Sequence, residues 1–491
     1  MTAFRCTGRL AAVLWTVLTF ALTLALTPVS LGLAAEAESL PNVVVIFVDD
    51  LGYGDLGCYG ADDIPTPHLD RMAAEGVRLT DFYVTAPFCS PSRASLLTGC
   101  YPLRVDLPRV LHPHENKGLN PEETTIAKAF KSRGYATGCL GKWHVGHHDA
   151  FLPPRHGFDE SLVIPYSHDM YRGAPWAGGF GAGWPDYVPL LRDGKEVGQL
   201  RGVDDFSTMT RRFTDAAIDF IRRHRERPFF LYLPQPMPHL EIKVPKPWVG
   251  VSKRGPYGDI VAELDGSVGE ILSVLKELDL DDRTLVVFTS DNGPAAIYQR
   301  PEFSGGSAGP FSGRKATWYE GGLRVPCVVR WPGKLPAGKV CREVATVMDL
   351  LPTMAAIIGA ELPEEPIDGH DMAPLLMQPD EARTPYDAFY YYRNEQLIAV
   401  RGGDWKLWVQ RREYASDGSV REVRPAELYH LCDDPAEKNN VAAENPEVVA
   451  QLNALADRIR RELGDRANHQ PAAEVIPGPA IRKTFHAKPA G

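Results

Sequence analysis

The sequence of 491 residues lacks several features that would place it in particular protein classes. It has no run of basic residues, and its formal charge is −10, so a nucleic-acid partner is not expected. No Asn-x-Ser/Thr acceptor for N-glycosylation occurs, which favours a bacterial envelope or secreted protein over a lysosomal glycoprotein. No internal repeat is visible, so a solenoid or propeller is not indicated either.

Cysteine is also scarce, with eight residues in the whole chain. Small secreted domains that depend on disulfides are far richer in cysteine, so a disulfide-built fold is excluded. One or two bridges are possible, but the sequence does not pair the cysteines. Apart from Cys6 near the N-terminus and Cys89, which is discussed below, the cysteines are Cys58, Cys100, Cys139, Cys327, Cys341 and Cys432.

Long apolar runs are absent except at the N-terminus. There, two arginines precede an apolar run over residues 10–26, and small residues follow it, as in a secretory signal peptide cut after about Ala35 or Ala37. The alternative is an uncleaved membrane anchor, because the run approaches the length of a spanning helix. We therefore expect residues 1–37 to be a signal peptide and the mature protein to be secreted or periplasmic.

The rest of the chain has an ordinary globular composition, with 44% hydrophobic and 24% charged residues. Short apolar runs rich in β-branched residues alternate with amphipathic helical patterns, which predicts a three-layer α/β domain with a mostly parallel sheet. The expected strands are residues 42–48, 135–140, 229–233, 284–289 and 327–331, and the expected helices are residues 69–75, 122–133, 210–224 and 260–278.

A polar, proline-flanked stretch over residues 379–385 predicts a domain boundary, with a catalytic domain over 38–380 and a smaller α+β domain over 381–491. The second domain should contain short strands joined by a turn at Gly402-Gly403-Asp404, followed by a helix over 448–463 and an irregular tail from residue 466. The expected strands are residues 388–392, 397–401, 405–409 and 426–431.

Carboxylate and amide side chains follow two of the predicted strands. Asp49 and Asp50 come directly after the first strand, and Asp291 and Asn292 follow the strand over residues 284–289. Ligands of such sheets bind beyond the carboxyl ends of the strands. A set of oxygen donors favours calcium, or less strongly magnesium, over zinc. Adjacent aspartates also occur in turns and helix caps, which is the alternative for Asp49 and Asp50.

Basic and imidazole side chains follow other predicted strands. Lys142 and His144 lie two residues apart just past a strand, so both can face one cleft if the segment is extended. His239 follows the strand over residues 229–233, and Lys315 follows a glycine-rich stretch. Taken singly, each of these residues is more often a solvated or structural side chain. Their convergence at one edge of the sheet predicts a single active site.

The segment Cys89-Ser90-Pro91-Ser92-Arg93 carries the most specific pattern. Ser90 is suited to cap a helix, Pro91 to occupy its first position and Gly99 to end it. The side chain at position 89 would then lie at the positive end of a short helix, a favourable place for sulfate or phosphate, with Arg93 in the first turn. The alternative is that Cys89 is simply a small buried apolar residue.

C-x-P-x-R is the sequence read by the enzyme that oxidises cysteine to formylglycine, and the chain resembles the type I, formylglycine-dependent sulfatases over nearly all its expected mature length. The similarity is greatest to the branch containing arylsulfatase A and N-acetylgalactosamine-6-sulfatase. His68 departs from the asparagine common in the family. Besides the cysteine motif, the matching segments include Val48-Asp49-Asp50-Leu51-Gly52, Thr66-Pro67-His68-Leu69-Asp70, Gly141-Lys142-Trp143-His144, Pro165-Tyr166-Ser167-His168-Asp169, Ser290-Asp291-Asn292-Gly293 and Glu320-Gly321-Gly322.

The resemblance implies an alkaline-phosphatase-like fold and hydrolysis of sulfate monoesters. It implies that a maturing enzyme converts Cys89 to formylglycine, whose hydrated form is held by calcium and forms a covalent intermediate with sulfate. The implied calcium ligands are residue 89, Asp49, Asp50, Asp291 and Asn292. Arg93 would stabilise the hydrated aldehyde, and His144 would assist release of sulfate. The implied groups that hold the sulfate or the leaving oxygen are Lys142, His239, Lys315 and Ser167.

Two other functions remain open at this stage. A phosphomonoester or phosphodiester hydrolase of the same architecture would need a Ser or Thr nucleophile and usually two metals, whereas position 89 is Cys. A catalytically inactive protein that binds sulfated glycans would not need the full set of charged residues. A sulfated carbohydrate is the expected substrate, and loops over 170–198 and 302–310 would set its specificity. In or near these loops, Trp176, Trp184, Tyr187 and Tyr298 are candidates for stacking on sugar rings, although exposed loop aromatics are as often packed locally.

Overall fold

The computed structural model describes residues 40–174, 183–295, 305–409, 411–414, 420–465 and 486. The predicted signal peptide, Trp176, Tyr298 and nearly all of the predicted tail therefore lie outside the described residues. Within the described part of the chain, no helix combines the length and the apolar character needed to cross a membrane.

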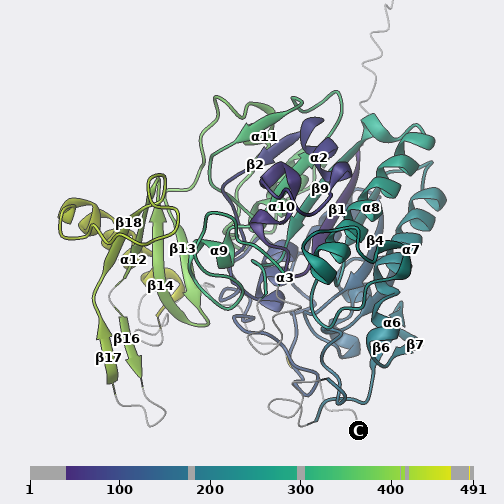
Figure 1. Cartoon of the computed structure of the whole chain (residues 1–491), viewed down its shortest axis with the longest axis horizontal. Helices are drawn as coiled ribbons and strands as arrows, with labels where there is room; N and C mark the ends of the chain where they lie inside the picture. Colours follow the sequence, from purple (N-terminus) through teal and green to yellow (C-terminus); the bar gives the residue numbers. More distant parts are fainter. Residues whose placement is uncertain are drawn as a thin grey trace, which may run out of the picture. The chain divides into compact units, whose positions relative to one another are not determined.

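A ten-stranded sheet forms the centre of the described structure (Figure 1). Its five middle strands, β9, β1, β8, β4 and β5, run parallel, and antiparallel strands extend it on both sides, which confirms the mostly parallel sheet. In spatial order the strands are β11 (Lys339–Cys341), β2 (Val77–Leu79), β10 (Cys327–Arg330), β9 (Thr284–Ser290), β1 (Asn42–Val48), β8 (Phe229–Leu233), β4 (Ala136–Lys142), β5 (Glu160–Ile164), β6 (Val188–Arg192) and β7 (Lys195–Leu200).

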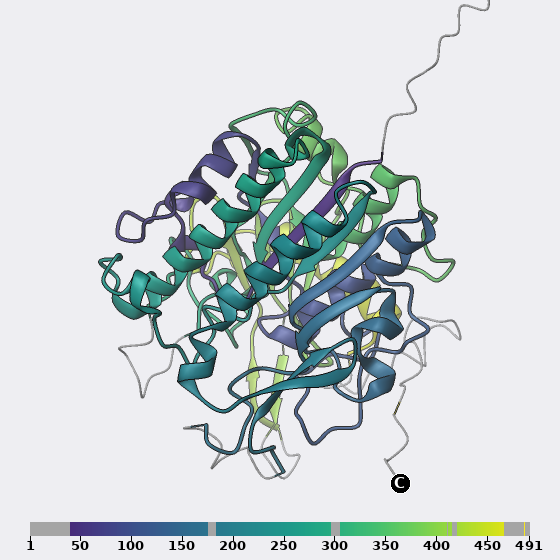
Figure 2. The ribbon, with the colours of Figure 1, turned by 90° about the vertical axis from the view of Figure 1, so that its right-hand side faces the viewer.

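Helices cover both faces of this sheet, so the three layers are confirmed. The helices α2 (Pro67–Ala74), α7 (Met209–Arg223) and α8 (Gly255–Glu277) pack together on one face; Figure 2 shows α7 and α8 lying across it. The second layer contains α3 (Cys89–Thr98), α4 (Ile126–Ser132) and α10 (Leu350–Ile358). Every residue of β1 is buried because the strand is covered on both sides, which accounts for its continuous apolar sequence.

The C-terminal part folds as predicted into a small antiparallel sheet with one long helix. Its strands are β13 (Phe389–Arg393), β14 (Gln396–Gly402), β15 (Trp405–Trp408) and β18 (Glu427–His430), and α12 (Pro446–Leu463) packs on β14 and β15. The predicted turn joins β14 to β15, and Gly403 has a positive φ of 56° there, which suits glycine. A separate pair is formed by β16 (Arg411–Tyr414) and β17 (Val420–Arg424).

Shorter elements connect these parts. A two-stranded parallel pair consists of β3 (Phe82–Tyr83) and β12 (Ala345–Thr346). The short α-helices are α6 (Val203–Phe206), α9 (Glu320–Leu323) and α11 (Ala373–Met377). The 3-10 helices are Tyr53–Asp55, Gly57–Tyr59, Asp149–Phe151, Pro153–His156, Lys246–Trp248, Asp281–Arg283 and Val347–Asp349.

Candidate active site

The ends of β1 and β9 bring the predicted oxygen donors together. These strands pair in parallel with Val48 opposite Ser290, so the residues that follow each strand emerge side by side. The backbone N–H of Asp50 donates to Asp291 Oδ1 at 3.2 Å, and Asn292 Nδ2 donates to Asp50 Oδ1 at 2.7 Å. Asp49, Asp50, Asp291 and Asn292 are all buried.

Three basic side chains neutralise the three carboxylates. Lys142 Nζ donates to Asp49 Oδ2 at 2.5 Å, Lys315 Nζ donates to Asp50 Oδ1 at 2.6 Å, and Arg93 donates through Nε and Nη2 to Asp291 Oδ2. Burial by itself would raise the pKa of Asp49, but the charges of Lys142, His239 and Arg93 hold it well below its ordinary value. Burial, and then the charge of Asp49, raise the pKa of Asp291 to about 6. The formal charges of the three carboxylates and the three cations cancel.

Cys89 is the first residue of α3 and faces this cluster. Its Sγ lies 3.4 Å from Asp49 Oδ1 and 3.7 Å from Lys315 Nζ. Burial raises the pKa of the thiol well above its ordinary value, and Asp49 adds to the rise. The unmodified side chain is therefore a neutral thiol, which is a poor nucleophile compared with a thiolate.

The predicted capping of α3 is wrong in detail. The helix begins two residues earlier than expected, so Phe88 occupies the N-cap position without a side-chain bond, and Pro91 is the third helical residue. The hydroxyl of Ser90 instead accepts a hydrogen bond from the backbone N–H of Leu111 at 3.1 Å. Arg93 is the fifth helical residue, beyond the first turn, and it pairs with Asp291. Gly99 ends the helix with a φ of 69°, as predicted.

Lys142 and His144 both reach the site, but not along an extended segment. The strand β4 extends through Lys142, two residues further than predicted, and His144 has a positive φ of 58°. Gly141 allows β4 to approach the residue that follows β8, because a Cβ at position 141 would lie 2.0 Å from the carbonyl oxygen of Pro234. The sequence shows Gly141, but it does not show the close contact with Pro234 that requires a residue without a side chain.

His144 is arranged as a neutral base. Its Nε2 lies 3.0 Å from the carbonyl oxygen of Leu111, which only accepts, so Nε2 carries the proton and Nδ1 has a free lone pair. Nδ1 is buried and has no hydrogen-bond partner among the described residues. Burial lowers the pKa of His144 well below its ordinary value, and the charges of Lys142 and Arg93 lower it further.

His239 adjoins the cluster at Asp50. Its Nδ1 donates to the carbonyl oxygen of Leu240, and its Nε2 lies 3.6 Å from Asp50 Oδ2. Ser167 Oγ accepts from Lys142 Nζ at 3.1 Å, so the predicted sulfate contact adjoins the lysine.

The sequence interpretation gave no role to His168 and Asp169, although both lie in a matching segment. The ring of His168 is 5.4 Å from that of His239 in an edge-to-face arrangement. The carboxylate of Asp169 accepts a hydrogen bond from Ser167, and its other oxygen, Oδ1, has no partner among the described residues. Their place in the Pro165–Asp169 motif was the signal that could have identified them.

The segment that carries Lys315 is held by the C-terminal sheet. Trp318 Nε1 donates to the carbonyl oxygen of Tyr392 at 2.7 Å, and Ser312 Oγ donates to that of Ala436 at 2.6 Å. Lys406 Nζ donates to the carbonyl oxygen of Trp318 at 2.9 Å. The smaller sheet therefore fixes the position of a charged residue in the cluster, a role that the sequence did not indicate.

The side chains present fit a calcium ion. Ligand atoms of Asp49, Asp50, Cys89 and His239 all lie within 4.8 Å of one another. Asn292 Oδ1 is buried without a partner among the described residues, so a further oxygen donor is available. A donor set dominated by carboxylate and amide oxygens is typical of calcium.

Asp291, which the family resemblance names as a ligand, lies outside that group of four. Its two oxygens accept hydrogen bonds from Arg93 and from the N–H of Asp50.

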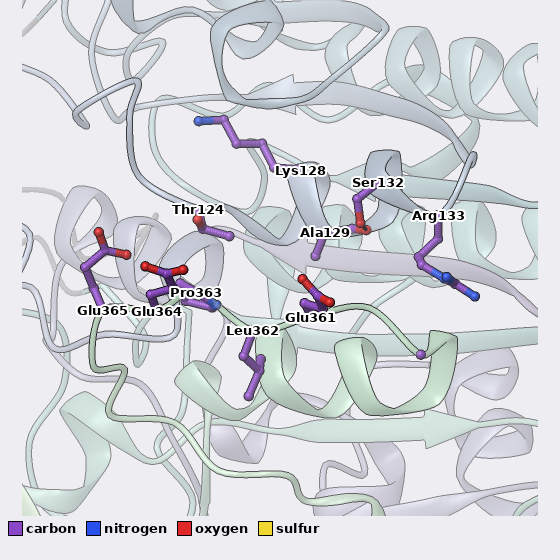
Figure 3. Close-up of a pocket in the computed structure, with 11 residues that line it drawn as sticks. Thr124, Lys128, Ala129, Ser132, Arg133, Glu361, Leu362, Pro363, Glu364 and Glu365 are labelled. Atoms are coloured by element: carbon purple, nitrogen blue, oxygen red, sulfur yellow. Dashed lines mark hydrogen bonds between the residues drawn. The ribbon is translucent and has the colours of Figure 1, made fainter.

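Two other features of the surface do not coincide with this cluster. A hollow of about 620 Å³ lies between α4 and the loop after α10, lined by residues such as Lys128, Arg133 and Glu361 (Figure 3), and none of its lining residues was predicted to be functional. Trp184 is only 3% exposed, and Tyr187 packs 4.8 Å beneath the guanidinium of Arg201. The expectation that these two rings are open stacking platforms for sugars is therefore wrong for Trp184 and unsupported for Tyr187.

Comparison with known proteins identifies the family. The family model described as "Sulfatase" matches residues 41–360, and the model "N-sulphoglucosamine sulphohydrolase, C-terminal" matches residues 308–464. The chain belongs to the sulfatase family. It is 39% identical to human arylsulfatase A over 447 residues, which cover 84% of this chain and 87% of the relative. It is 38% identical to dog N-acetylgalactosamine-6-sulfatase, with 92% and 91% covered. The protein is accordingly a sulfuric ester hydrolase.

Solved structures confirm the fold of this sulfatase. A protein of Bacteroides thetaiotaomicron, described with the metabolism of multiple glycosaminoglycans, has a TM-score of 0.74 and 29% identity, with 86% of this chain and 99% of that one covered. Ps i-CgsB in complex with a neocarrahexaose has a TM-score of 0.73 and 29% identity, with 86% and 92% covered. A phosphonate monoester hydrolase of Agrobacterium radiobacter shares the alkaline-phosphatase-like fold at 21% identity and a TM-score of 0.60, with 87% and 97% covered.

Proposed function

We propose that this sulfuric ester hydrolase works through a formylglycine made from Cys89 and a bound calcium ion, and that its substrate is a sulfated carbohydrate. The observation that carries the proposal is the charge arrangement around residue 89. Three carboxylates and three cations surround a side chain that, unmodified, is a neutral thiol. A modification that replaces the thiol by a hydrated aldehyde would provide the nucleophile that this position lacks.

Asp49, Asp50, Asp291 and Asn292, together with residue 89, would hold the calcium ion. Bound there, the ion would supply positive charge toward the sulfate group and the nucleophile. Because the charges of the surrounding side chains already cancel, the two charges of the ion would make the site attractive to an anion. This resolves the conflict between an acidic protein and an anionic substrate.

The remaining side chains divide between binding and proton transfer. Lys142 and Lys315 flank residue 89 and would hold the sulfate oxygens, with Ser167 beside Lys142. Arg93 would hold the hydroxyl groups of the modified residue. His239 would protonate the leaving oxygen. His144 would accept a proton at Nδ1 as sulfate is released, because its Nε2 proton is committed to Leu111.

A carbohydrate substrate is supported by the names of similar proteins. One relative is an N-acetylgalactosamine-6-sulfatase, and two structural neighbours are described in complex with a neocarrahexaose and with glucosamine-2-N,6-O-disulfate. The first of these neighbours shares 29% identity with the chain.

We further propose a mature, exported enzyme that begins near Glu36 or Glu38, with domains over 38–380 and 381–491. N-terminal sequencing of the exported protein tests the cleavage. Met1 at the start of the exported form would favour an uncleaved anchor.

Expression with and without a formylglycine-generating enzyme tests the proposed nucleophile. We expect release of sulfate from 4-nitrophenyl sulfate only after maturation, together with the aldehyde at position 89 in the mass spectrum of the corresponding peptide. Cys89→Ala provides the matched control and should be inactive in both preparations. Equal activity in the two preparations, or faster hydrolysis of 4-nitrophenyl phosphate, would contradict the proposal.

A further inference from the structure

Two aromatic side chains, from segments that carry members of the cluster, contact each other. Phe88 immediately precedes Cys89, and Trp318 lies three residues after Lys315. Their rings meet edge to face, with centroids 6.1 Å apart and an interplanar angle of 63°. Both side chains are partly exposed. A partly exposed aromatic pair therefore joins the segments that carry residue 89 and Lys315.

Two hydrogen bonds with the C-terminal sheet hold Trp318 in place. Its indole Nε1 donates to the carbonyl oxygen of Tyr392 at 2.7 Å, and its own carbonyl oxygen accepts from the buried Lys406 at 2.9 Å. Both partners belong to the C-terminal sheet. A ring fixed by hydrogen bonds in the free protein loses little conformational freedom when a ligand binds against it.

Arg393, the last residue of β13, lies over this ring. Its guanidinium carbon is 5.9 Å from the centroid of Trp318, and Nη2 donates to Gln396 Oε1 at 2.7 Å. No carboxylate lies within 4.0 Å of its guanidinium among the residues that the structure describes. Other guanidinium groups near the centre of the molecule do have carboxylate partners, as Arg93, Arg324 and Arg401 do. Arg393 is thus a partly exposed cation with further donors available, and it is connected to the segment of residue 89 through the rings of Trp318 and Phe88.

We propose that Arg393, backed by Trp318, is a second anion-binding subsite, which holds a sulfate or carboxylate group on the part of the substrate next to the sulfate that is cleaved. A guanidinium offers paired donors that match the oxygens of either anion. The aromatic ring beneath it would contact the apolar face of the adjoining sugar. The preferred substrate is therefore an oligosaccharide with at least two anionic groups. This inference rests on the proposed function and specifies its substrate.

The test compares substrates that carry one or two anionic groups. 4-Methylumbelliferyl sulfate has one anionic group and no sugar, so its hydrolysis reports the cluster alone. The unsaturated chondroitin 6-sulfate disaccharide carries a carboxylate beside its sulfated sugar, and an ι-carrageenan tetrasaccharide carries sulfates on neighbouring sugars. Each is measured as an inhibitor of 4-methylumbelliferyl sulfate hydrolysis and by calorimetry as a ligand of the non-hydrolysing variant Cys89→Ala.

For Arg393→Gln, we expect binding of at least one oligosaccharide to weaken about tenfold, while KM and kcat for 4-methylumbelliferyl sulfate change less than about twofold. Arg393→Lys, which keeps the charge but loses the paired donors, should give an intermediate loss. Trp318→Leu should weaken the same oligosaccharide. Added salt should reduce the difference between wild type and Arg393→Gln. Arg222→Gln, on the exposed face of α7, is the control and should change neither measurement.

The oligosaccharide that is affected identifies the anion: the chondroitin disaccharide indicates a carboxylate, and the carrageenan tetrasaccharide indicates a sulfate. Equal effects of Arg393→Gln on aryl sulfate and oligosaccharides would overturn the proposal, as would failure of both oligosaccharides to bind the wild-type site. Failure of the proposed function looks different, because wild type would then not hydrolyse 4-methylumbelliferyl sulfate after maturation.

Discussion

At residue 89, the unmodified cysteine side chain is poorly suited to attack an ester. The thiol is buried, its pKa is raised by burial and by Asp49, and it lies 3.4 Å from a carboxylate oxygen. A thiolate there would be repelled by the same carboxylates that a metal ion requires. The proposed chemistry uses the two hydroxyl groups of a hydrated formylglycine: one attacks sulfur, and the other expels the sulfate. A substitution that supplies only one hydroxyl therefore separates these two steps.

Cys89→Ser should accept sulfate without releasing it. The serine hydroxyl can attack sulfur, but no second hydroxyl is present to expel the sulfate, so a stable sulfate ester should accumulate at position 89. Mass spectrometry after incubation with 4-nitrophenyl sulfate measures this adduct. Cys89→Ala should be inactive and unmodified, and His144→Ala in the matured enzyme should slow release. Sustained turnover by the serine variant would show that ordinary ester chemistry is sufficient.

Asn292 offers a test of the proposed calcium site that changes no charge. Its Oδ1 has no partner among the described residues, so Asn292→Ala removes an available metal ligand, together with the hydrogen bonds that Nδ2 donates to Asp50 and Gly293. We expect the calcium concentration for half-maximal activity to rise about tenfold, because one ligand is lost. The melting temperature in EDTA should fall modestly, because the hydrogen bonds from Nδ2 are lost.

Asp291→Ala is less informative, because it would leave the buried Arg93 without its closest partner. Stoichiometric zinc in the purified enzyme, or the same calcium dependence in Asn292→Ala and wild type, would contradict the calcium assignment.

At the scale of single elements, the helix α8 contains a carboxyl group in an unfavourable place. Glu263 is buried on this helix, and burial raises its pKa from the ordinary value of 4.5 to about 8. The folded protein therefore keeps this proton up to a higher pH than the unfolded chain does. Between pH 4.5 and about 8 the folded state binds more protons, so this group makes the protein less stable as pH rises.

Glu263→Gln should remove that loss of stability. Relative to wild type, the variant should show no gain in unfolding free energy near pH 4 and a gain on the order of 1–3 kcal/mol at pH 9. Chemical denaturation at the two pH values measures the difference. Glu277→Gln, at the exposed end of the same helix, is the control. A gain that is equal at both pH values would show that the effect does not come from ionisation of Glu263.

At the scale of the whole molecule, a buried ionic cluster connects the C-terminal sheet to the larger sheet. Lys406 on β15 donates to Glu320 at 3.0 Å and lies 3.1 Å from Glu437, and all three are buried. Burial alone would raise the pKa of Glu320, but Lys406, Arg401 and Arg324 hold it at about 2. Removal of the lysine would leave two carboxylates in the interior without their main cation.

Lys406→Met should therefore be strongly destabilised, by about 3–5 kcal/mol in unfolding free energy. Because Lys406 also holds the carbonyl of Trp318, the variant should lose oligosaccharide binding before it loses hydrolysis of the aryl sulfate. Lys406→Met with Glu437→Gln should recover part of the stability, since one of the two unpaired charges is removed. A denaturation midpoint equal to that of wild type in Lys406→Met would disprove the assigned role of this cluster.

The sequence by itself determined the parts of the protein that depend on local pattern. Continuous β-branched runs predicted the central strands, because strands covered on both faces are apolar throughout, and polar residues after those runs predicted which side chains meet. Asp49 and Lys142 were identified in this way, whereas Cys89 was identified by the C-x-P-x-R motif and Lys315 by the family resemblance. The sequence predicted the ends of elements less well. The helix α3 begins at Cys89 because Phe88, not Ser90, takes the extended conformation before it.

Only the tertiary structure decided which groups pair and which remain available. The ion pair between Arg93 and Asp291, the hydrogen bond between His144 Nε2 and Leu111, and the position of Arg393 over Trp318 join residues that are between 33 and 198 positions apart. Local patterns contain no information on such distances, because hydrogen bonds and ion pairs depend on spacing in ångströms rather than in residues. The sequence therefore identified the reactive groups, and the fold set their protonation states, their partners and the anion-binding residue beside them.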